Sequence, residues 1–205
     1  MAGTASNARS LLGQDFFARA RERLTLELPP GLADPNITPT HGDHDADPVM
    51  RAIAAVRPIR PAAVLVPIVD RPEPTVLLTQ RTTELSSHAG QIAFPGGKID
   101  PGDASPLAAA LREASEEIGL DRRLVHPIGY LDLYLTTLGY RIVPTVAREV
   151  PLAFLMQPIN HQRHSREWNG MIRHFYAIPF ADRYIWGVTA GILRNLHDRI
   201  YRDDS

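Results

Sequence analysis

Start and end signals for one helix lie in the middle of this sequence of 205 residues and fix the position of that helix. Ser105 is a typical N-cap, Pro106 suits the first helical position, and Gly119 is typical of the residue just past a helix end. Apolar residues recur between these signals at the spacing of a helix with one buried stripe. The predicted stripe consists of Leu107, Ala110, Leu111, Ala114 and Ile118.

Three glutamates, Glu113, Glu116 and Glu117, stand at positions i, i+3 and i+4 of this helix and share one of its faces. Like charges at this spacing repel one another, so the face requires a compensating cation. Hard divalent metals such as Mg²⁺ bind carboxylate oxygens and share their remaining sites with water and substrate phosphates. A solvated, glutamate-rich helix face is the alternative interpretation. The Gly-Gly pair upstream and Arg112, directly before the first glutamate, favour the metal site.

The stretch from Gly97 to Leu120 resembles the Nudix box, the signature of hydrolases that cleave nucleoside diphosphates linked to another moiety. The family pattern is a Gly, five residues, a Glu, seven residues and then Arg-Glu-apolar-x-Glu-Glu-x-Gly-apolar. Gly97 supplies the first Gly, and residues 112–120 match the final motif in full. The middle departs from the pattern, because Asp103 replaces the isolated Glu and eight residues, instead of seven, separate it from Arg112.

A second stretch, residues 77–97 with the sequence LLTQRTTELSSHAGQIAFPGG, is similar to a signature of the coenzyme A diphosphatase branch of Nudix enzymes. That branch carries LLT-x-R, then G-x-x-x-FPGG, and the box that is longer by one residue. The Arg often found a few residues after Arg81 is absent here. The resemblance therefore extends over two adjoining motifs.

The resemblance implies an α/β fold, a Nudix-type α/β/α sandwich with a mixed central sheet and an N-terminal helical extension. It implies hydrolysis of coenzyme A, or of its derivatives, to 3′,5′-ADP and 4′-phosphopantetheine with Mg²⁺ or Mn²⁺. Two alternatives stay open. The same chemistry could act on ADP-ribose, a dinucleotide or another nucleoside diphosphate derivative, because a fold does not specify its substrate. The chain could also be a catalytically silent Nudix-like binding domain.

The same resemblance assigns site residues. The implied metal ligands are Glu113, Glu116, Glu117 and Gly97, the last through a backbone carbonyl of the Gly-Gly pair. The implied catalytic residues are Glu113, which would orient or deprotonate the water, Glu116, and Arg112, which would steer the glutamates with Asp103 as its partner. The implied substrate-binding residues are Arg81, Gly96 and Gly97.

A catalytic base from the loop near Arg148 cannot be named from the resemblance. Relatives carry a longer, acid-bearing loop after the strand that ends near Arg148, whereas here Arg148 runs directly into Glu149. Whether this loop is truly short, and whether the general base is Glu113 or a residue of the loop, therefore stays open.

Composition limits the partners and the compartment. A formal net charge of −1 excludes a broad basic surface, so we expect a small-molecule substrate and no nucleic acid. The absence of Cys excludes disulfides and thiolate metal sites and fits a reducing compartment. No apolar run approaches the ~18–20 residues of a membrane span, and the N-terminus has no secretory apolar core. We therefore expect a cytoplasmic protein with no membrane association.

The pattern along the chain predicts an N-terminal helix and Pro-rich extension over residues 1–60 and a hydrolase domain over residues 61–205. Gln14–Leu28 is an amphipathic helix that would pack on the domain or form a homodimer. Pro29–Pro48 is predicted to be an irregular linker. Its tract His41–Asp47 contains His and Asp residues that resemble a metal site, but such residues are common in loops, so no metal site is predicted there.

Strand and helix signals fill the rest of the chain. The predicted strands are Ala62–Val69, Thr75–Thr79, Gln91–Phe94, Val125–Leu135 and Tyr140–Val146, with Gly96-Gly97 as a loop. Ser165–Trp168 and Met171–Ile178 flank Asn169-Gly170, a strong hairpin signal. Ala181–Tyr201 is predicted to be the final helix.

Overall fold

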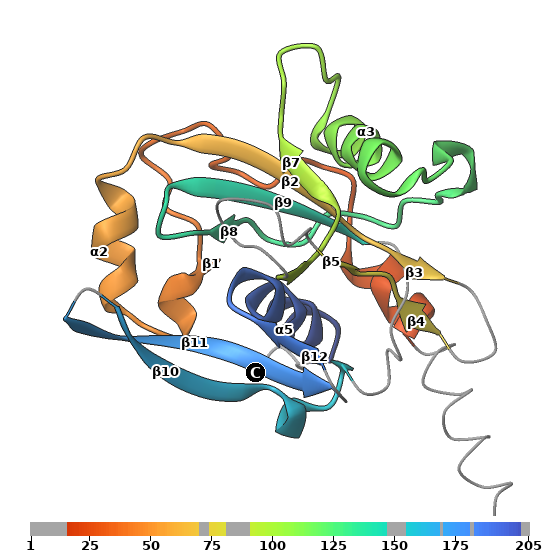
Figure 1. The fold of residues 1–205 in the computed structure, drawn as a ribbon. Coiled ribbons are helices and arrows are strands. Elements are labelled where there is room, and N and C mark those ends of the chain that lie inside the picture. The colour runs from red at the N-terminus through yellow and green to blue at the C-terminus, as the bar shows by residue number, and fades with distance from the viewer. Residues whose placement is uncertain are drawn as a thin grey trace, which may run out of the picture.

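The computed structural model describes residues 16–69, 74–80, 91–146, 155–168, 170–180 and 183–201, and these form two main sheets (Figure 1). The larger sheet has the strand order β1–β8–β9–β2–β7. Its strands are β1 (His41–Gly42), β8 (Tyr134–Leu135), β9 (Tyr140–Val146), β2 (Arg60–Val66) and β7 (Gly96–Lys98). β1 pairs with β8, and β9 with β2, in parallel, whereas β8–β9 and β2–β7 are antiparallel. The predicted mixed sheet is therefore confirmed.

The remaining strands are antiparallel. The second sheet contains β10 (Gln162–Trp168), β11 (Met171–Phe180) and β12 (Arg183–Trp186). Two short pairs are β3 (Ile68–Val69) with β4 (Thr75–Val76), and β5 (Thr79–Gln80) with β6 (Ile92–Ala93). Besides the N-terminal helix described below, the helices are α2 (Val49–Ala55), α3 (Pro106–Ile118) and α5 (Val188–Tyr201), with 3₁₀ turns η1 (Asp43–Asp45), η2 (Arg122–Leu124) and η3 (Pro158–Asn160). None of the described helices is long and apolar enough to cross a membrane.

Strand β2 separates two hydrophobic layers. Successive side chains of a strand point to opposite faces of its sheet. Ala62 and Val66 accordingly join the cluster that contains α5, whereas Ala63 and Leu65 join the cluster that contains α3. The two helices lie on opposite faces of the larger sheet, and α5 lies between the two sheets (Figure 1). This arrangement agrees with the α/β/α sandwich expected from the sequence.

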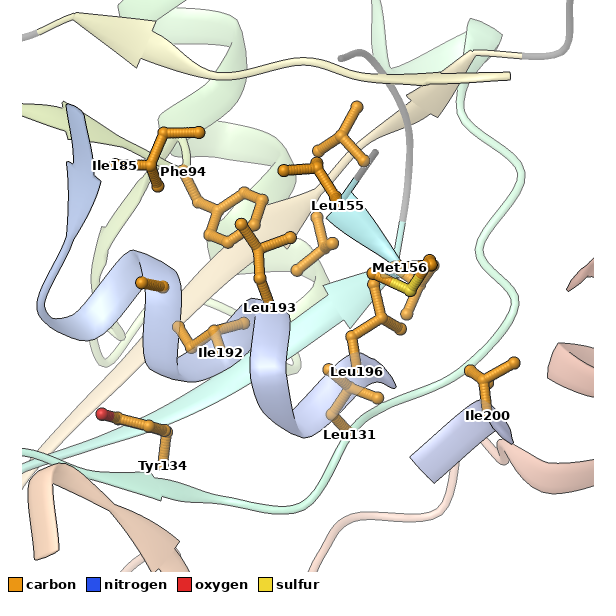
Figure 2. Packing of buried hydrophobic residues seen from close by; sticks show 14 of the residues in the cluster. Phe94, Leu131, Tyr134, Leu155, Met156, Ile185, Ile192, Leu193, Leu196 and Ile200 are labelled. Carbon is orange, nitrogen blue, oxygen red and sulfur yellow. The ribbon is translucent and has the colours of Figure 1, made fainter. Parts of the chain in front are cut away.

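Helix α5 supplies much of the main core. Its buried residues pack against side chains from several strands and loops (Figure 2). The labelled members from α5 are Ile192, Leu193, Leu196 and Ile200, and their labelled neighbours include Phe94, Leu131, Leu155, Met156 and Ile185. These four α5 residues are each exposed by 1% or less, so the final helix is a core element.

The N-terminal helix packs on the same core. Residues 16–23 are helical, and Phe16, Ala20 and the following Leu24 belong to the cluster that contains α5. Of the two roles predicted for this amphipathic helix, packing on the domain is confirmed.

Helix α3 has the predicted ends. The Ser105 hydroxyl accepts a hydrogen bond from the Ala108 N–H at 3.1 Å, and Gly119 is left-handed with φ 65°. The predicted buried stripe is partly wrong. The observed buried face of α3 also includes Pro106 and Ala109, whereas Ile118, predicted to be buried, is 36% exposed.

The predicted linker Pro29–Pro48 is wrong in its last third, which contains β1 and η1. Asp43 anchors this part of the chain. Its carboxylate accepts hydrogen bonds from the Thr137 N–H at 2.8 Å, the Thr137 hydroxyl at 2.7 Å and the Tyr134 hydroxyl at 3.1 Å. Burial raises the pKa of Asp43 above its usual range despite these donors. Helix α2, which follows directly, was not predicted.

Three other boundaries also differ from the prediction. Residues 183–186 form β12 and not the start of the final helix, because Ile185 pairs with Ile178 of β11. Only the end of the predicted strand Val125–Leu135 is β8, although Tyr130 bridges Thr25 and Thr145. The Gly-Gly pair lies in strand β7 and not in a loop.

His41 generates a prediction about stability and pH. Its Nδ1 lies 3.2 Å from the Asp45 carboxylate and its Nε2 lies 3.9 Å from that of Asp132. The hydrogen bond to Asp45 raises the pKa of His41 above 6.5, opposed by burial and assisted by the charges of Asp45, Asp132 and Asp198. A raised folded-state pKa stabilises the fold fully below the unfolded pKa, and this contribution is lost as pH rises through the folded value.

We therefore expect the unfolding free energy of His41→Gln to fall less than that of the wild type between about pH 6 and pH 8. Urea unfolding at each pH measures this difference. The matched control is His126→Gln, because His126 is exposed and makes no ion pair among the described residues. Equal pH slopes for His41→Gln and the wild type would contradict the prediction.

Candidate active site

The three glutamates of α3 come close to β7 because the contact between helix and sheet is made of small side chains. Ala109, Ala110 and Ala114 are fully buried and share a cluster with Ala63 and Leu65 of β2. Methyl groups let the helix axis approach the sheet more closely than larger side chains would. The glutamate face of α3 is thereby placed beside β7, the neighbour of β2.

Gly97 provides the space for the first glutamate. Gly97 pairs with Ala63 of β2. A Cβ atom at this position would lie 2.6 Å from both Cδ and Oε1 of Glu113, which is far closer than carbon and oxygen atoms approach without bonding. Glycine is therefore required for the observed position of the Glu113 carboxylate.

Glu113 and Glu116 share one hydrogen-bond donor, and Glu117 accepts from another. The Arg112 Nη1 donates to Glu113 Oε1 at 3.0 Å and to Glu116 Oε2 at 3.3 Å. Glu117 instead accepts a hydrogen bond from the Gly96 N–H through Oε2 at 3.2 Å. The structure thus brings Glu113 and Glu116 together on one guanidinium nitrogen and places Glu117 against the backbone of β7.

Arg112 is held from its other side by Asp103. The Arg112 Nε and Nη2 donate to the two Asp103 oxygens at 3.1 and 3.0 Å, a bidentate pair. The Asp103 side chain is only 8% exposed, and the hydrogen bonds from Arg112 hold the pKa of this carboxyl below its usual range. The same bonds, and the one to Glu113, raise the pKa of Arg112. The predicted pairing of Arg112 with Asp103 is confirmed as a contact.

Two further partners of Arg112 were missed by the sequence reasoning. The Arg112 Nη2 donates to the Lys98 carbonyl at 3.2 Å and lies 3.5 Å from the Asp100 carboxylate. A signal for Asp100 was present, because Asp-Pro-Gly-Asp is a turn sequence with Asp and Pro in favourable positions. The turn closes through the hydrogen bond from the Asp103 N–H to the Asp100 carbonyl, at 2.9 Å. This turn places Asp100 and Asp103 on the same side of Arg112.

The donor chemistry of the site fits a hard divalent cation. Glu113 Oε2 and Glu116 Oε1 accept no hydrogen bond from the described residues, so each carboxylate keeps an oxygen for another ligand. Carboxylate oxygens are the ligands that Mg²⁺ and related ions prefer. As the side chains stand, no three acidic, His or Cys side chains among the described residues are grouped closely enough to hold a metal. In this arrangement Arg112 occupies one oxygen of both Glu113 and Glu116.

Arg81, predicted to bind substrate, lies outside the described residues, as does the segment 147–154 that contains Arg148 and Glu149. The other predicted site residues, Arg112, Glu113, Glu116, Glu117, Gly96 and Gly97, lie together along α3 and β7.

Comparisons with known proteins identify the family of this chain. The sequence model of the NUDIX domain matches residues 59–172. Proteins named Uncharacterized Nudix hydrolase NudL are 37% identical over 159 residues, in Yersinia pestis (strain Pestoides F) and in Yersinia pseudotuberculosis serotype O:1b (strain IP 31758). Each match covers 69% of this chain and 80% of the relative.

A solved structure is also similar to this chain. It is the crystal structure of a Nudix hydrolase from M. smegmatis, RenU, at 21% identity and a TM-score of 0.33, covering 57% of this chain and 70% of that chain. The domain match includes the residues of both α3 and β7. The chain therefore belongs to the Nudix hydrolase family, whose members hydrolyse the pyrophosphate bond of nucleoside diphosphate derivatives and generally need divalent metal ions.

Proposed function

We propose that this chain hydrolyses the pyrophosphate bond of coenzyme A, or of its derivatives, to 3′,5′-ADP and 4′-phosphopantetheine in the cytoplasm. The observation that carries the proposal is the joint placement of Glu113, Glu116 and Glu117 beside Gly96 and Gly97 of β7. The coenzyme A branch is supported by the LLTQR and FPGG motifs and by the longer box. The cytoplasmic placement is supported by the absence of Cys.

In this proposal Glu113, Glu116 and Glu117, with a backbone carbonyl of Gly97, would hold Mg²⁺ or Mn²⁺. The ion, when bound, offsets negative charge on the phosphoryl oxygens and makes water a stronger nucleophile. Arg112 leaves one oxygen of Glu113 and one of Glu116 available for this ion, and its Nε and Nη2 are held by Asp103.

Glu113 is the residue we assign to the attacking water. Its side chain is 20% exposed, against 60% for Glu116, so it is the more enclosed of the two carboxylates bound by Arg112. Water adds to one phosphorus, the bridging P–O bond breaks, and the proton of the water passes to Glu113 or to water beyond it. Arg112 positions Glu113 by its hydrogen bond, and Arg81 would bind the phosphates of the substrate.

Incubation with coenzyme A tests the reaction and the site together. We expect wild-type protein with Mg²⁺ or Mn²⁺ to produce 3′,5′-ADP and 4′-phosphopantetheine, identified by mass spectrometry. Glu116→Gln removes a charge and keeps the shape of the side chain, so it should reduce kcat by about 10²-fold or more. ADP-ribose and a dinucleotide are tested as alternative substrates in the same assay.

The outcomes separate the alternatives. Turnover of ADP-ribose with coenzyme A left intact would contradict the proposed substrate but agree with the proposed pyrophosphate hydrolysis. If Glu116→Gln still hydrolyses coenzyme A at the wild-type rate, the assignment of Glu116 to the active site is contradicted. Absence of turnover on every substrate would favour a silent binding domain.

Gly97 gives a second test of the site. Gly97→Ala should displace the Glu113 carboxylate, and we expect kcat/KM to fall by about 10²-fold, the size of effect that follows from a displacement of about 1 Å at a catalytic group. The matched control is Gly102→Ala, because a Cβ at Gly102 meets no atom within 4 Å. Steady-state kinetics of both variants measure this difference. Equal activity of the two variants would show that the position of Glu113 does not limit the reaction.

A further inference from the structure

Strand β10 has one free edge. It lies at the border of the second sheet and pairs only with β11 (Figure 1). No residue of β10 makes a backbone hydrogen bond to any strand except β11 in the part of the chain that the structure describes. An unpaired strand edge presents a row of N–H and C=O groups that can bind another strand.

Contacts on the far side of β11 identify which groups of β10 point outward. The His174 N–H donates to Asp47 at 3.4 Å, and the Tyr176 carbonyl accepts from the Gly187 N–H at 2.9 Å. The backbone groups of His174 and Tyr176 therefore point away from β10. In an antiparallel ladder, residues opposite each other point their backbone groups both inward or both outward.

The partners of these two residues on β10 therefore point outward. Ser165 pairs with His174, and Arg163 pairs with Tyr176. Glu167 follows at the same two-residue period. The free edge of β10 thus presents the N–H and C=O groups of Arg163, Ser165 and Glu167.

The strand is self-complementary about its central residue. Its sequence is Gln-Arg-His-Ser-Arg-Glu-Trp, with Ser165 in the middle. When two antiparallel copies meet at Ser165, Arg163 of each copy lies opposite Glu167 of the other. Opposite charges at directly opposed positions stabilise a sheet, and like charges destabilise it.

We propose that two copies of this chain pair through β10 about a two-fold axis at Ser165, which joins their three-stranded sheets into one. In this register each outward residue, Arg163, Ser165 and Glu167, exchanges backbone hydrogen bonds with its opposed residue. The full length of both strands is paired. Moving the axis to Arg166 would oppose two arginines, and moving it to His164 would oppose two histidines, so the charges favour the register at Ser165.

Apolar surface at the end of β10 would be covered by this pairing. Trp168 is 59% exposed, and Met171, opposite it in the hairpin, is 47% exposed. In the proposed dimer Trp168 lies opposite Gln162 of the second copy, in a pair without hydrogen bonds, where side chains approach most closely. Partly exposed tryptophans are enriched among the residues that contribute most to interfaces.

Ser165→Pro tests the backbone pairing. Proline removes an N–H, and at Ser165 that N–H points to the free edge, so no bond to β11 is lost. We expect sedimentation velocity to show a dimer for the wild type and a monomer for Ser165→Pro, with the same circular dichroism spectrum. Ser165→Thr keeps the N–H and should remain a dimer. A monomeric wild type, or a dimer that survives Ser165→Pro, would overturn the proposal.

A charge exchange tests the register without proline. Glu167→Arg places Arg opposite Arg163, and Arg163→Glu places Glu opposite Glu167, so each variant alone should associate about tenfold more weakly or worse. An equimolar mixture of the two variants opposes unlike charges again and should recover the dimer as a heterodimer. Thermal unfolding confirms that each variant is folded, since Arg163 also donates to the Ala46 carbonyl. Equal association of the variants and of their mixture would overturn the register.

Discussion

One guanidinium lies among four carboxylates at the acidic helix of this protein. Arg112 makes bidentate hydrogen bonds to Asp103, bonds Glu113 and Glu116 with a single nitrogen, and lies 3.5 Å from Asp100. Without this cation, the glutamates would repel one another across one turn of helix. The position of the site therefore depends on Arg112, and the position of Arg112 depends on Asp103, which is the least exposed of these four carboxylates.

The same site depends on small residues on both sides of the contact. Alanines on α3 let the helix approach β2, and Gly97 on β7 leaves room for the Glu113 carboxylate. The face of the larger sheet opposite α3 is covered by α5, whose leucines and isoleucines are fully buried. The sheet is therefore fixed from both faces, and α3 can present a charged surface at a defined position while its apolar face is packed.

The sequence predicted those elements whose structure depends on residues close together along the chain. The caps of α3, its glutamate face, strand β9 and the β10–β11 hairpin each depend on residues close in sequence, and each was predicted. The segment His41–Asp45 was misread because Asp43 is held by Tyr134 and Thr137, about ninety residues away. Ile185 fits the apolar spacing of a helix, and only its pairing with Ile178 places it in a strand. The turn sequence marked Asp100 as a turn residue, but its contact with Arg112, twelve residues later on α3, depends on how the turn packs against the helix.

A double-mutant cycle on Asp103 and Arg112 tests the central claim most directly, because that claim is that Asp103 acts on the glutamates through Arg112. The quantities to measure are the Mn²⁺ dissociation constant, by electron paramagnetic resonance, and kcat/KM in Asp103→Ala, Arg112→Ala and the double variant. We predict that Asp103→Ala raises the Mn²⁺ dissociation constant and lowers kcat/KM in the wild-type background. The same substitution should change both quantities little once Arg112 is absent, so the effects of the two substitutions are not additive. Additive effects of the two substitutions would contradict the account.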